Sequence, residues 1–434
     1  MDRKGSRGSQ SRADRRKKRR FSSNQFTVER ETSHTSASAA KFKNSGDEEV
    51  IINKNFGYCI LEFYSVFQTL STLIVCATCK EEIKFSQTAP RGLGFKIALQ
   101  CNCESITYIQ SCPTVNKAYE INRRIVTAMK LLGVGREGIN IFCSVMDICQ
   151  GLCVNTYNSC LDNLHSAASA VYHQLISKAV KEEEELLAES EPGENKKHLT
   201  VSGVSTWKQR GFASLFGVTT LIGKYSKKVV DTVVKSSFCQ DCNLWKGKNK
   251  SDVNYQDWFK EHANSCAINC KESSGKMERD AVLEMFNRSV EKYEVKYSKF
   301  IGNGEDVLDM NPYDDNPVVE KQCLGSETQN NNNESLFSLI WTFAPKHILP
   351  GTHTIQIANY LAVAIFNEGF LPILKIMELM GITVGTEAHT FAVRRNELRV
   401  DSSELKAASA GSKKIPEIGY EVEEGPMYGS GSAD

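Results

Sequence analysis

The 434-residue sequence predicts a mixed α/β fold: a central sheet with helices, preceded by a small strand-rich module and a helical block. Two observations support this prediction. Segments rich in β-branched residues follow one another from residue 198 to 238, and apolar residues recur at three- and four-residue intervals in the segments on either side. Since no stretch offers about 18 uninterrupted apolar residues, we expect a soluble intracellular protein with no membrane partner.

Residues 1–46 are predicted to form a disordered basic arm, because this segment offers few aliphatic side chains to bury. The arm contains a dense run of basic side chains: Arg15, Arg16, Lys17, Lys18, Arg19 and Arg20. Such runs are typical of nuclear-import signals and nucleic-acid contacts, so we expect DNA as a partner and the nucleus as the location. The alternative is a solvated charged tail that binds no receptor.

Residues 47–114 are predicted to form a zinc-ribbon-like module. Cys76 and Cys79 are followed after twenty-one residues by Cys101 and Cys103, with strand-like sequence between the pairs. Two tight turns that each present two thiolates supply the four ligands of a structural zinc ion. The alternative is a set of free buried cysteines. The apolar segment 51–75, which precedes the first pair, is expected to be a buried helix or strand.

A helical block is predicted for residues 115–192. Apolar residues recur with helical spacing at Ile125, Met129 and Leu132, and Gly133 then interrupts the pattern. A second long helix is expected from 158 to about 190, ending at a Pro-Gly boundary. Arg123 and Arg124 in the first helix either contact DNA phosphates or form a solvated face.

Residues 193–383 are predicted to form the central domain. Three strands are expected at 198–207, 213–223 and 227–238, followed by a helix at 276–293 and a strand at 296–301. Three consecutive strands, a helix and another strand are the opening order of a ribonuclease H-like α/β domain. The apolar segments after the polar tract 327–335 are predicted to be helical. Residues 384–434 are expected to be extended and to form a flexible tail.

A second cysteine group follows the third predicted strand and suggests a zinc knuckle over residues 239–270. Cys239, Cys242, Cys266 and Cys270 could complete a tetrahedral site, and His262 competes as the fourth ligand. We interpret this group as a structural zinc site, because the protein would occupy every ligand position. The alternative is a cysteine-rich loop without metal.

Several blocks of this sequence resemble Mutator-like transposases, a family of DDE-type enzymes that move DNA. The similar blocks are residues 121–148, 201–247, 274–305, 328–341 and 423–429. The resemblance implies a catalytic centre in which three carboxylates hold two divalent ions, Mg²⁺ or Mn²⁺, that activate the attacking oxygen and stabilise the leaving one. It also implies a DNA partner and leaves a homo-oligomer open.

The three acid positions implied by this resemblance are degenerate in this chain. The first lies in a family pattern like Val-Ser-x-Asp-Gly-Thr-Trp, where this sequence has Val204 instead of aspartate. The second lies in a turn where Asn303 replaces an aspartate and Glu305 keeps a negative charge. The third, Glu334, is intact. The sequence also lacks a long family insertion at a junction near 323–327.

These observations predict a transposase-derived DNA-binding protein, nuclear and stabilised by zinc, with little or no catalytic activity. One alternative is an active metal-dependent transposase or nuclease that recruits substitute acids such as Glu305, Asp306 or Asp309. A second alternative is a nuclear adaptor or regulator adopted by the host, and a third is a product without function.

Overall fold

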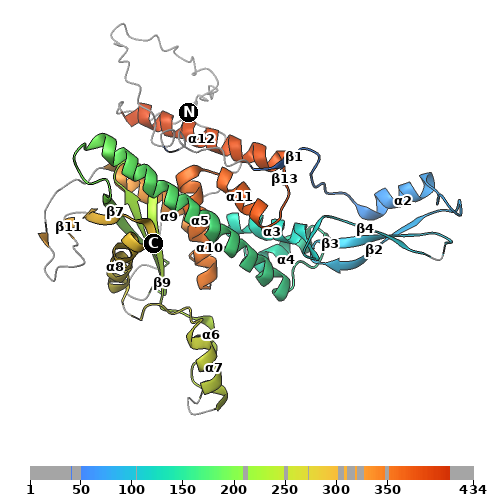
Figure 1. The fold of residues 1–434 in the computed structure, drawn as a ribbon. Helices are drawn as coiled ribbons and strands as arrows, with labels where there is room; N and C mark the ends of the chain where they lie inside the picture. Colours follow the sequence, from blue (N-terminus) through green and yellow to red (C-terminus); the bar gives the residue numbers. More distant parts are fainter. Residues whose placement is uncertain are drawn as a thin grey trace, which may run out of the picture. The chain divides into compact units, whose positions relative to one another are not determined.

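The computed structural model describes residues 41, 50–103, 105–208, 214–248, 253–271, 273–301, 307–309, 318–319, 327–347 and 351–410. Over these residues the chain is a mixed α/β protein, as predicted (Figure 1). The basic arm before residue 41 and the tail after residue 410 lie outside the described residues.

The largest sheet has six strands in the order β12-β11-β10-β7-β8-β9. Its strands are β7 (His198–Trp207), β8 (Phe216–Gly223), β9 (Val229–Ser236), β10 (Lys296–Ile301), β11 (Val307–Asp309) and β12 (Val318–Val319). β8 runs antiparallel to β7 and β9, β10 runs parallel to β7, and β11 and β12 continue antiparallel. The three strands from residue 198 to 238 and the strand at 296–301 are therefore confirmed.

Helices cover both faces of this sheet, as the contacts of two adjacent residues of β9 show. The hydroxyl of Thr232 lies 2.9 Å from that of Tyr172 in α5 and accepts a hydrogen bond from Asn359 in α10. Its neighbour Asp231 pairs with Arg288 in α8, at 2.7 Å. Because successive strand residues point to opposite faces, α5 and α10 cover one face and α8 the other. β8, in the interior of the sheet, is buried over its whole length.

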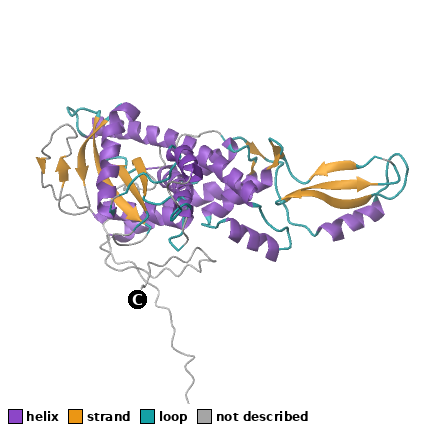
Figure 2. Cartoon of the chain, turned by 90° about the horizontal axis from the view of Figure 1, so that it is seen from below, coloured by secondary structure: helices purple, strands orange, loops and turns teal. Residues whose placement is uncertain are grey.

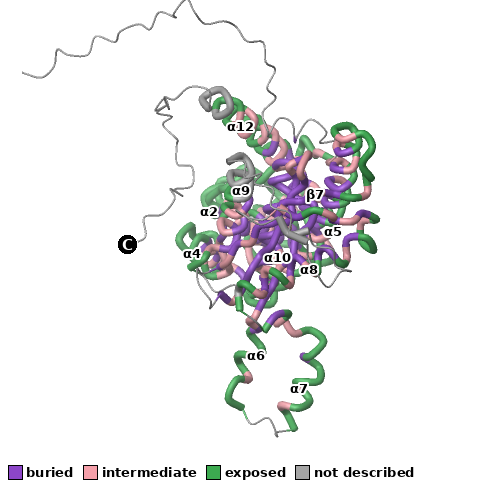
Figure 3. Tube along the Cα trace, turned by 90° about the vertical axis from the view of Figure 1, so that its left-hand side faces the viewer, coloured by how far each residue is buried: buried purple, intermediate pink, exposed green. Residues whose placement is uncertain are grey.

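The helical part of the fold contains long apolar helices that pack on one another. The bounds are α3 (Glu120–Leu131), α4 (Arg136–Val145), α5 (Val154–Ser190), α8 (Ser274–Tyr293), α9 (Glu327–Phe343), α10 (Thr352–Glu368), α11 (Leu371–Leu379) and α12 (Thr386–Ala410). α10 is buried along most of its length between α5, α9 and β9 (Figure 3). The predicted break after α3 is confirmed: Gly133 has φ +72°, and a Cβ there would lie 2.2 Å from the carbonyl oxygen of Thr342.

One edge of the sheet, strand β9, is covered by side chains instead of by another strand. Arg288 donates a hydrogen bond to the carbonyl of Thr232, and the Asn269 side chain binds the carbonyl of Val234 and the amide of Ser236. An edge strand with unpaired backbone groups is a template for aggregation. These contacts satisfy that backbone and attach the segment that returns from the second cysteine group to the sheet.

A separate three-stranded antiparallel sheet lies near the N-terminal side of the described chain (Figure 2). It consists of β2 (Lys84–Arg91), β3 (Gly94–Gln100) and β4 (Thr107–Gln110), with helix α2 (Phe63–Leu73) beside it. Phe63 packs on Phe95, and Phe67 packs on Phe85. Of α2 only Phe63 is buried, so the prediction that segment 51–75 is buried is wrong for most of this helix. A three-stranded sheet is too small to cover an eleven-residue helix on more than one side.

Four short strands complete the described fold: β1 (Ile52–Asn53), β5 (Thr114–Val115), β6 (Ala118–Tyr119) and β13 (Val384–Gly385). β1 pairs in parallel with β13, which joins segments from the two ends of the described chain.

The prediction that the chain is extended beyond residue 384 is wrong for residues 386–410, which form helix α12. The sequence of α12 is polar with sparse apolar residues, so it lacks the broad apolar face that identifies a core helix. Polar contacts contribute to its attachment: Asn396 accepts a hydrogen bond from the amide of Phe370, and Arg399 donates to the carbonyls of Ile365 and Phe366.

Candidate metal centres and the predicted catalytic positions

The first cysteine group comes together at one end of the small sheet. Cys76 and Cys79 lie in a turn before β2, and Cys101 and Cys103 follow β3; all four sulfur atoms lie within 4.8 Å of one another. The Sγ atoms of Cys76 and Cys103 are 3.9 Å apart. A tetrahedron of thiolates about 2.3 Å from zinc has edges of about 3.8 Å, so the observed spacing fits that ion.

The turn that carries Cys76 also stabilises a thiolate. Backbone N–H groups of Cys79 and Thr78 point at its sulfur and lower the pKa of the Cys76 thiol to about 6. The turn closes with a hydrogen bond of 2.9 Å from the amide of Lys80 to the carbonyl of Cys76, and Lys80 has a left-handed φ of 60°. The local backbone therefore favours the charged form that binds metal.

The second group comprises Cys239, Cys242, His262 and Cys266, whose ligand atoms also lie within 4.8 Å of one another. Short helices α6 (Gln240–Leu244) and α7 (Val253–Ala263) carry this knuckle between β9 and α8. The His262 Nε2 atom is 3.4 Å from the sulfur of Cys239 and 3.2 Å from that of Cys242. The sulfur atoms of Cys242 and Cys266 are 3.6 Å apart.

His262 is held in position by groups around it. Its Nδ1 atom lies 3.9 Å from a carboxylate oxygen of Asp241, and its ring stacks on Trp258 at 4.7 Å. Trp258 stacks in turn on Trp245 at 4.9 Å. The nearby carboxylate favours a proton on the second ring nitrogen, which leaves Nε2 free to bind metal. The stacked rings supply the small apolar core of the knuckle, whose surface is largely exposed (Figure 3).

Both groups are consistent with structural zinc. Each offers four protein ligands of the kinds that zinc prefers, with no position left for a reacting water. The sequence left the fourth ligand of the second group open between Cys270 and His262, and the structure places His262 in the group. Cys270 is buried beside β9 instead, where its amide donates to the carbonyl of Ser236.

Val204, at the first predicted acid position, lies in the middle of β7 and is only 7% exposed. Its neighbour β10 runs parallel to β7, and their pairing ends with Ile301 beside Ser202. The described pairing of β10 with β7 therefore ends two residues before Val204. Asn303 and Glu305, the second predicted position, belong to that segment and lie outside the described residues.

Glu334, the third predicted position, lies in α9 and is exposed. Later in the same helix, Trp341 donates its indole N–H to the hydroxyl of Thr206 at 2.8 Å. Thr206 lies two residues beyond Val204 and thus on the same face of β7. The end of α9 that carries Trp341 therefore contacts the strand face that carries Val204.

Arg123 and Arg124, the predicted phosphate contacts, bind acceptors within the protein. Arg123 is 8% exposed and donates to the carbonyl of Met380. Arg124 pairs with Glu120 at 2.7 Å and also donates to the carbonyl of Thr383. These internal acceptors account for the positions of both guanidinium groups, and DNA contact by these two arginines stays a prediction. The basic residues 15–20 lie outside the described residues.

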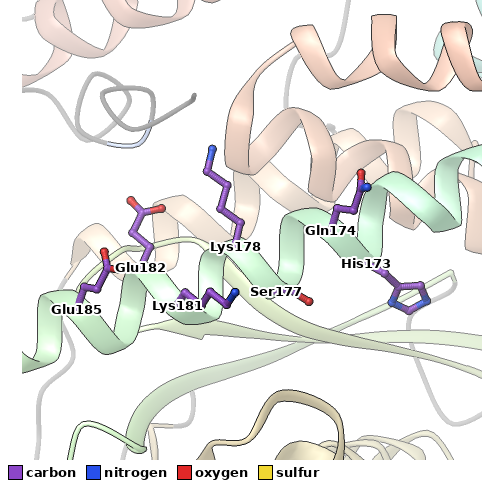
Figure 4. Close-up of a pocket in the computed structure, with 7 residues that line it drawn as sticks. All are labelled: His173, Gln174, Ser177, Lys178, Lys181, Glu182 and Glu185. Atoms are coloured by element: carbon purple, nitrogen blue, oxygen red, sulfur yellow. The ribbon is translucent and has the colours of Figure 1, made fainter. Parts of the chain in front are cut away.

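A surface groove of about 780 Å³ runs along α5, a feature that the sequence did not indicate (Figure 4). The described lining comes from this one helix: His173, Gln174, Ser177, Lys178, Lys181, Glu182 and Glu185. Lys178 is paired with Glu368, and Glu182 with Lys228. Among the described residues, the lining of the groove therefore includes neither cysteine group, nor Val204, nor Glu334.

Comparison with protein families decides the identity of the chain. The family model described as Mutator-like transposase matches residues 57–325, well over half of the 434 residues. The chain belongs to the Mutator-like transposase family. The match includes both cysteine groups and Val204, and it ends within the junction near 323–327, before Glu334. Comparisons with curated proteins and with solved structures find no match. No helix among the described residues is long and apolar enough to cross a membrane.

Proposed function

We propose that this member of the Mutator-like transposase family is a nuclear DNA-binding protein that has lost DNA cleavage. Two zinc ions stabilise it, and its central domain is of the ribonuclease H-like type. The observation that carries this proposal is the position of Val204, buried in β7 beside the end of the parallel strand β10.

The sheet supports the ribonuclease H-like assignment. Three consecutive antiparallel strands, β7 to β9, are followed by helix α8 and by β10, which returns beside β7 in the same direction. Neighbouring parallel strands bring their carboxyl ends to one edge of a sheet, where α/β proteins place their sites. This arrangement supports the proposal that the first and second predicted acid positions belong to one site.

The face of β7 that carries Val204 offers no carboxylate. Its neighbours on this face are Ser202 and Thr206. The Thr206 hydroxyl already accepts the indole N–H of Trp341. Because hard divalent ions need charged oxygen ligands, the replacement of an aspartate by valine removes the first ligand, and the exposed Glu334 alone cannot hold two metal ions.

DNA binding is supported by family membership and by the basic arm. Since Arg123 and Arg124 are held within the fold, the proposal assigns the main phosphate contacts to the run of basic residues 15–20. Binding of this kind depends on counterion release and is largely independent of DNA sequence.

Binding and cleavage by the full chain, measured in one preparation, test this proposal. Fluorescence anisotropy with a labelled DNA duplex follows binding from 50 to 300 mM salt, and a gel assay with Mn²⁺ follows strand cleavage. We expect affinity that falls steeply with salt and no cleavage. Alanine at all six basic positions should weaken binding at least tenfold.

Two outcomes contradict the proposal. Cleavage in Mn²⁺ that disappears in Glu334→Ala would show that the enzyme is active with substitute acids. Absence of binding at 50 mM salt would remove DNA as the partner and favour an adaptor function.

A further inference from the structure

Helix α12 has one face that packs on the protein. Ala392 is buried, Asn396 binds the backbone at Phe370, and Arg399 binds the backbone at Ile365 and Phe366. The elements in contact with α12 are α11, β13 and β1. The attachment therefore involves residues up to Arg399, although the helix continues to Ala410.

A different face of α12 carries an exposed apolar stripe. Phe391, Leu398 and Leu405 are 56%, 47% and 51% exposed. They are spaced seven residues apart, which is close to two helical turns, so they lie one above the other along about 21 Å of helix. The edge of Phe391 rests on Phe370, at 5.6 Å between ring centroids, while the two leucines remain at the surface.

Two charged residues of opposite sign lie between these apolar residues. Arg394 follows Phe391 by three positions, and Asp401 follows Leu398 by three positions; both side chains are exposed. Among the described residues, neither forms an ion pair. The stripe thus alternates in the order apolar, positive, apolar, negative, apolar.

This order is self-complementary about Leu398. If a second copy of α12 lies antiparallel across the stripe, Leu398 meets Leu398, and Phe391 meets Leu405 of the other copy. Arg394 of each copy then lies beside Asp401 of the other, which gives two ion pairs. A parallel arrangement places like charges side by side, which is unfavourable. The charges therefore select the antiparallel arrangement and a partner with the same sequence.

We propose that α12 is a dimerisation surface and that its partner is α12 of a second copy of this chain, related by a two-fold axis near Leu398. Such an isologous contact closes on itself and buries the stripe of both copies. It also gives tertiary support to the polar half of the helix, since isolated helical segments are marginal in water.

The contact is small. Two helical faces of this length bury less surface area than a standard protein–protein interface does. We therefore expect a reversible dimer with a Kd on the order of 10–100 μM. Leucine and phenylalanine supply the affinity, and the ion pairs set the direction of pairing. The proposal does not depend on DNA binding.

Sedimentation velocity of the full chain between 1 and 200 μM measures this equilibrium. We expect dimer formation in the wild type and its loss in Leu398→Asp. Val145→Asp in α4 is a matched control, because it changes an equally apolar and more exposed residue, 77% exposed, away from the stripe. Its Kd should equal that of the wild type. Circular dichroism and thermal unfolding confirm that each variant is folded.

Charge exchange gives the sharper test. Arg394→Asp and Asp401→Arg should each weaken dimerisation about tenfold, because each replaces two attractive pairs by two repulsive ones. The double variant R394D/D401R should recover the wild-type Kd within about threefold. A wild type that stays monomeric at 200 μM overturns the proposal, and so does a dimer that persists in Leu398→Asp. Failure of the double variant to recover overturns the antiparallel arrangement.

Discussion

The indole N–H of Trp341 donates a hydrogen bond of 2.8 Å to the hydroxyl of Thr206, and this contact ties helix α9 to strand β7. It joins two segments that are 135 positions apart in the sequence. Because Thr206 is on the same face of β7 as Val204, the contact also sets the place of α9, and thus of Glu334, relative to the proposed pocket.

A double-mutant cycle measures this contact. Trp341→Phe removes the donor and should reduce the free energy of unfolding by about 1–2 kcal/mol, because a largely buried hydroxyl loses its partner. Thr206→Val removes the acceptor. In the double variant the two losses should sum to more than the measured effect, with a coupling of about 1 kcal/mol. Urea unfolding gives all four values, and a coupling near zero would show that this hydrogen bond does not stabilise the fold.

The zinc content of the second cysteine group distinguishes His262 from Cys270 as a ligand. We expect two zinc ions per chain in the wild type, because both groups have complete ligand sets. His262→Ala should release one ion, whereas Cys270→Ala should retain both. Elemental analysis of protein purified without added zinc gives the stoichiometry. Retention of two ions by His262→Ala together with loss in Cys270→Ala would reverse the assignment.

Burial of Lys130 predicts a dependence of stability on pH. Burial lowers the pKa of Lys130 in the folded chain to about 8, from 10.5. Below pH 8 the lysine is charged in both the folded and unfolded states, and the folded state bears the cost of burying the charge. As pH rises from 8 to 10.5 the folded state loses the proton first, so this cost disappears and stability increases.

Comparison with Lys130→Met isolates this effect. At pH 7 the variant should be more stable than the wild type by up to about 3 kcal/mol, which is the cost of a shift of this size, and the difference should shrink by pH 9.5. Lys235→Met is the control, because Lys235 is paired with Glu284 at 2.7 Å. Urea unfolding at pH 7 and pH 9.5 measures the free energy of unfolding of each variant. If the stability difference between Lys130→Met and the wild type is the same at both pH values, the burial argument is wrong.

The sequence was sufficient to predict the central strands because their apolar pattern is local. The strands at 198–207 and 296–301 match β7 and β10, and Gly133 marks the end of α3. Cysteine spacing likewise identified the members of the first candidate metal centre and three members of the second, since closely spaced ligands need only local turns to converge. The choice of His262 depends on how α7 folds back over α6, which spacing alone does not specify.

The structure differs from the sequence-based prediction where contacts between distant parts of the chain determine the conformation. α12 is attached by Arg399 and Asn396 through backbone carbonyls and amides that no periodicity reveals. Arg123 and Arg124 have the composition of a DNA contact, yet their acceptors lie more than 250 residues away in the chain. A polar residue that binds a distant backbone group cannot be told from a solvated one by sequence pattern.

Manganese binding tests the central claim, that positions 204, 303 and 334 surround one pocket from which carboxylates have been lost. Electron paramagnetic resonance measures bound Mn²⁺ in the wild type and in Val204→Asp/Asn303→Asp, which returns the two acids. Val204→Asn/Asn303→Asp is the matched control, because asparagine has the shape of aspartate without its charge. We expect no saturable site in the wild type, a site in the restored variant, and weaker binding in the control. Tight binding by the wild type, or none by a folded restored variant, would contradict the account.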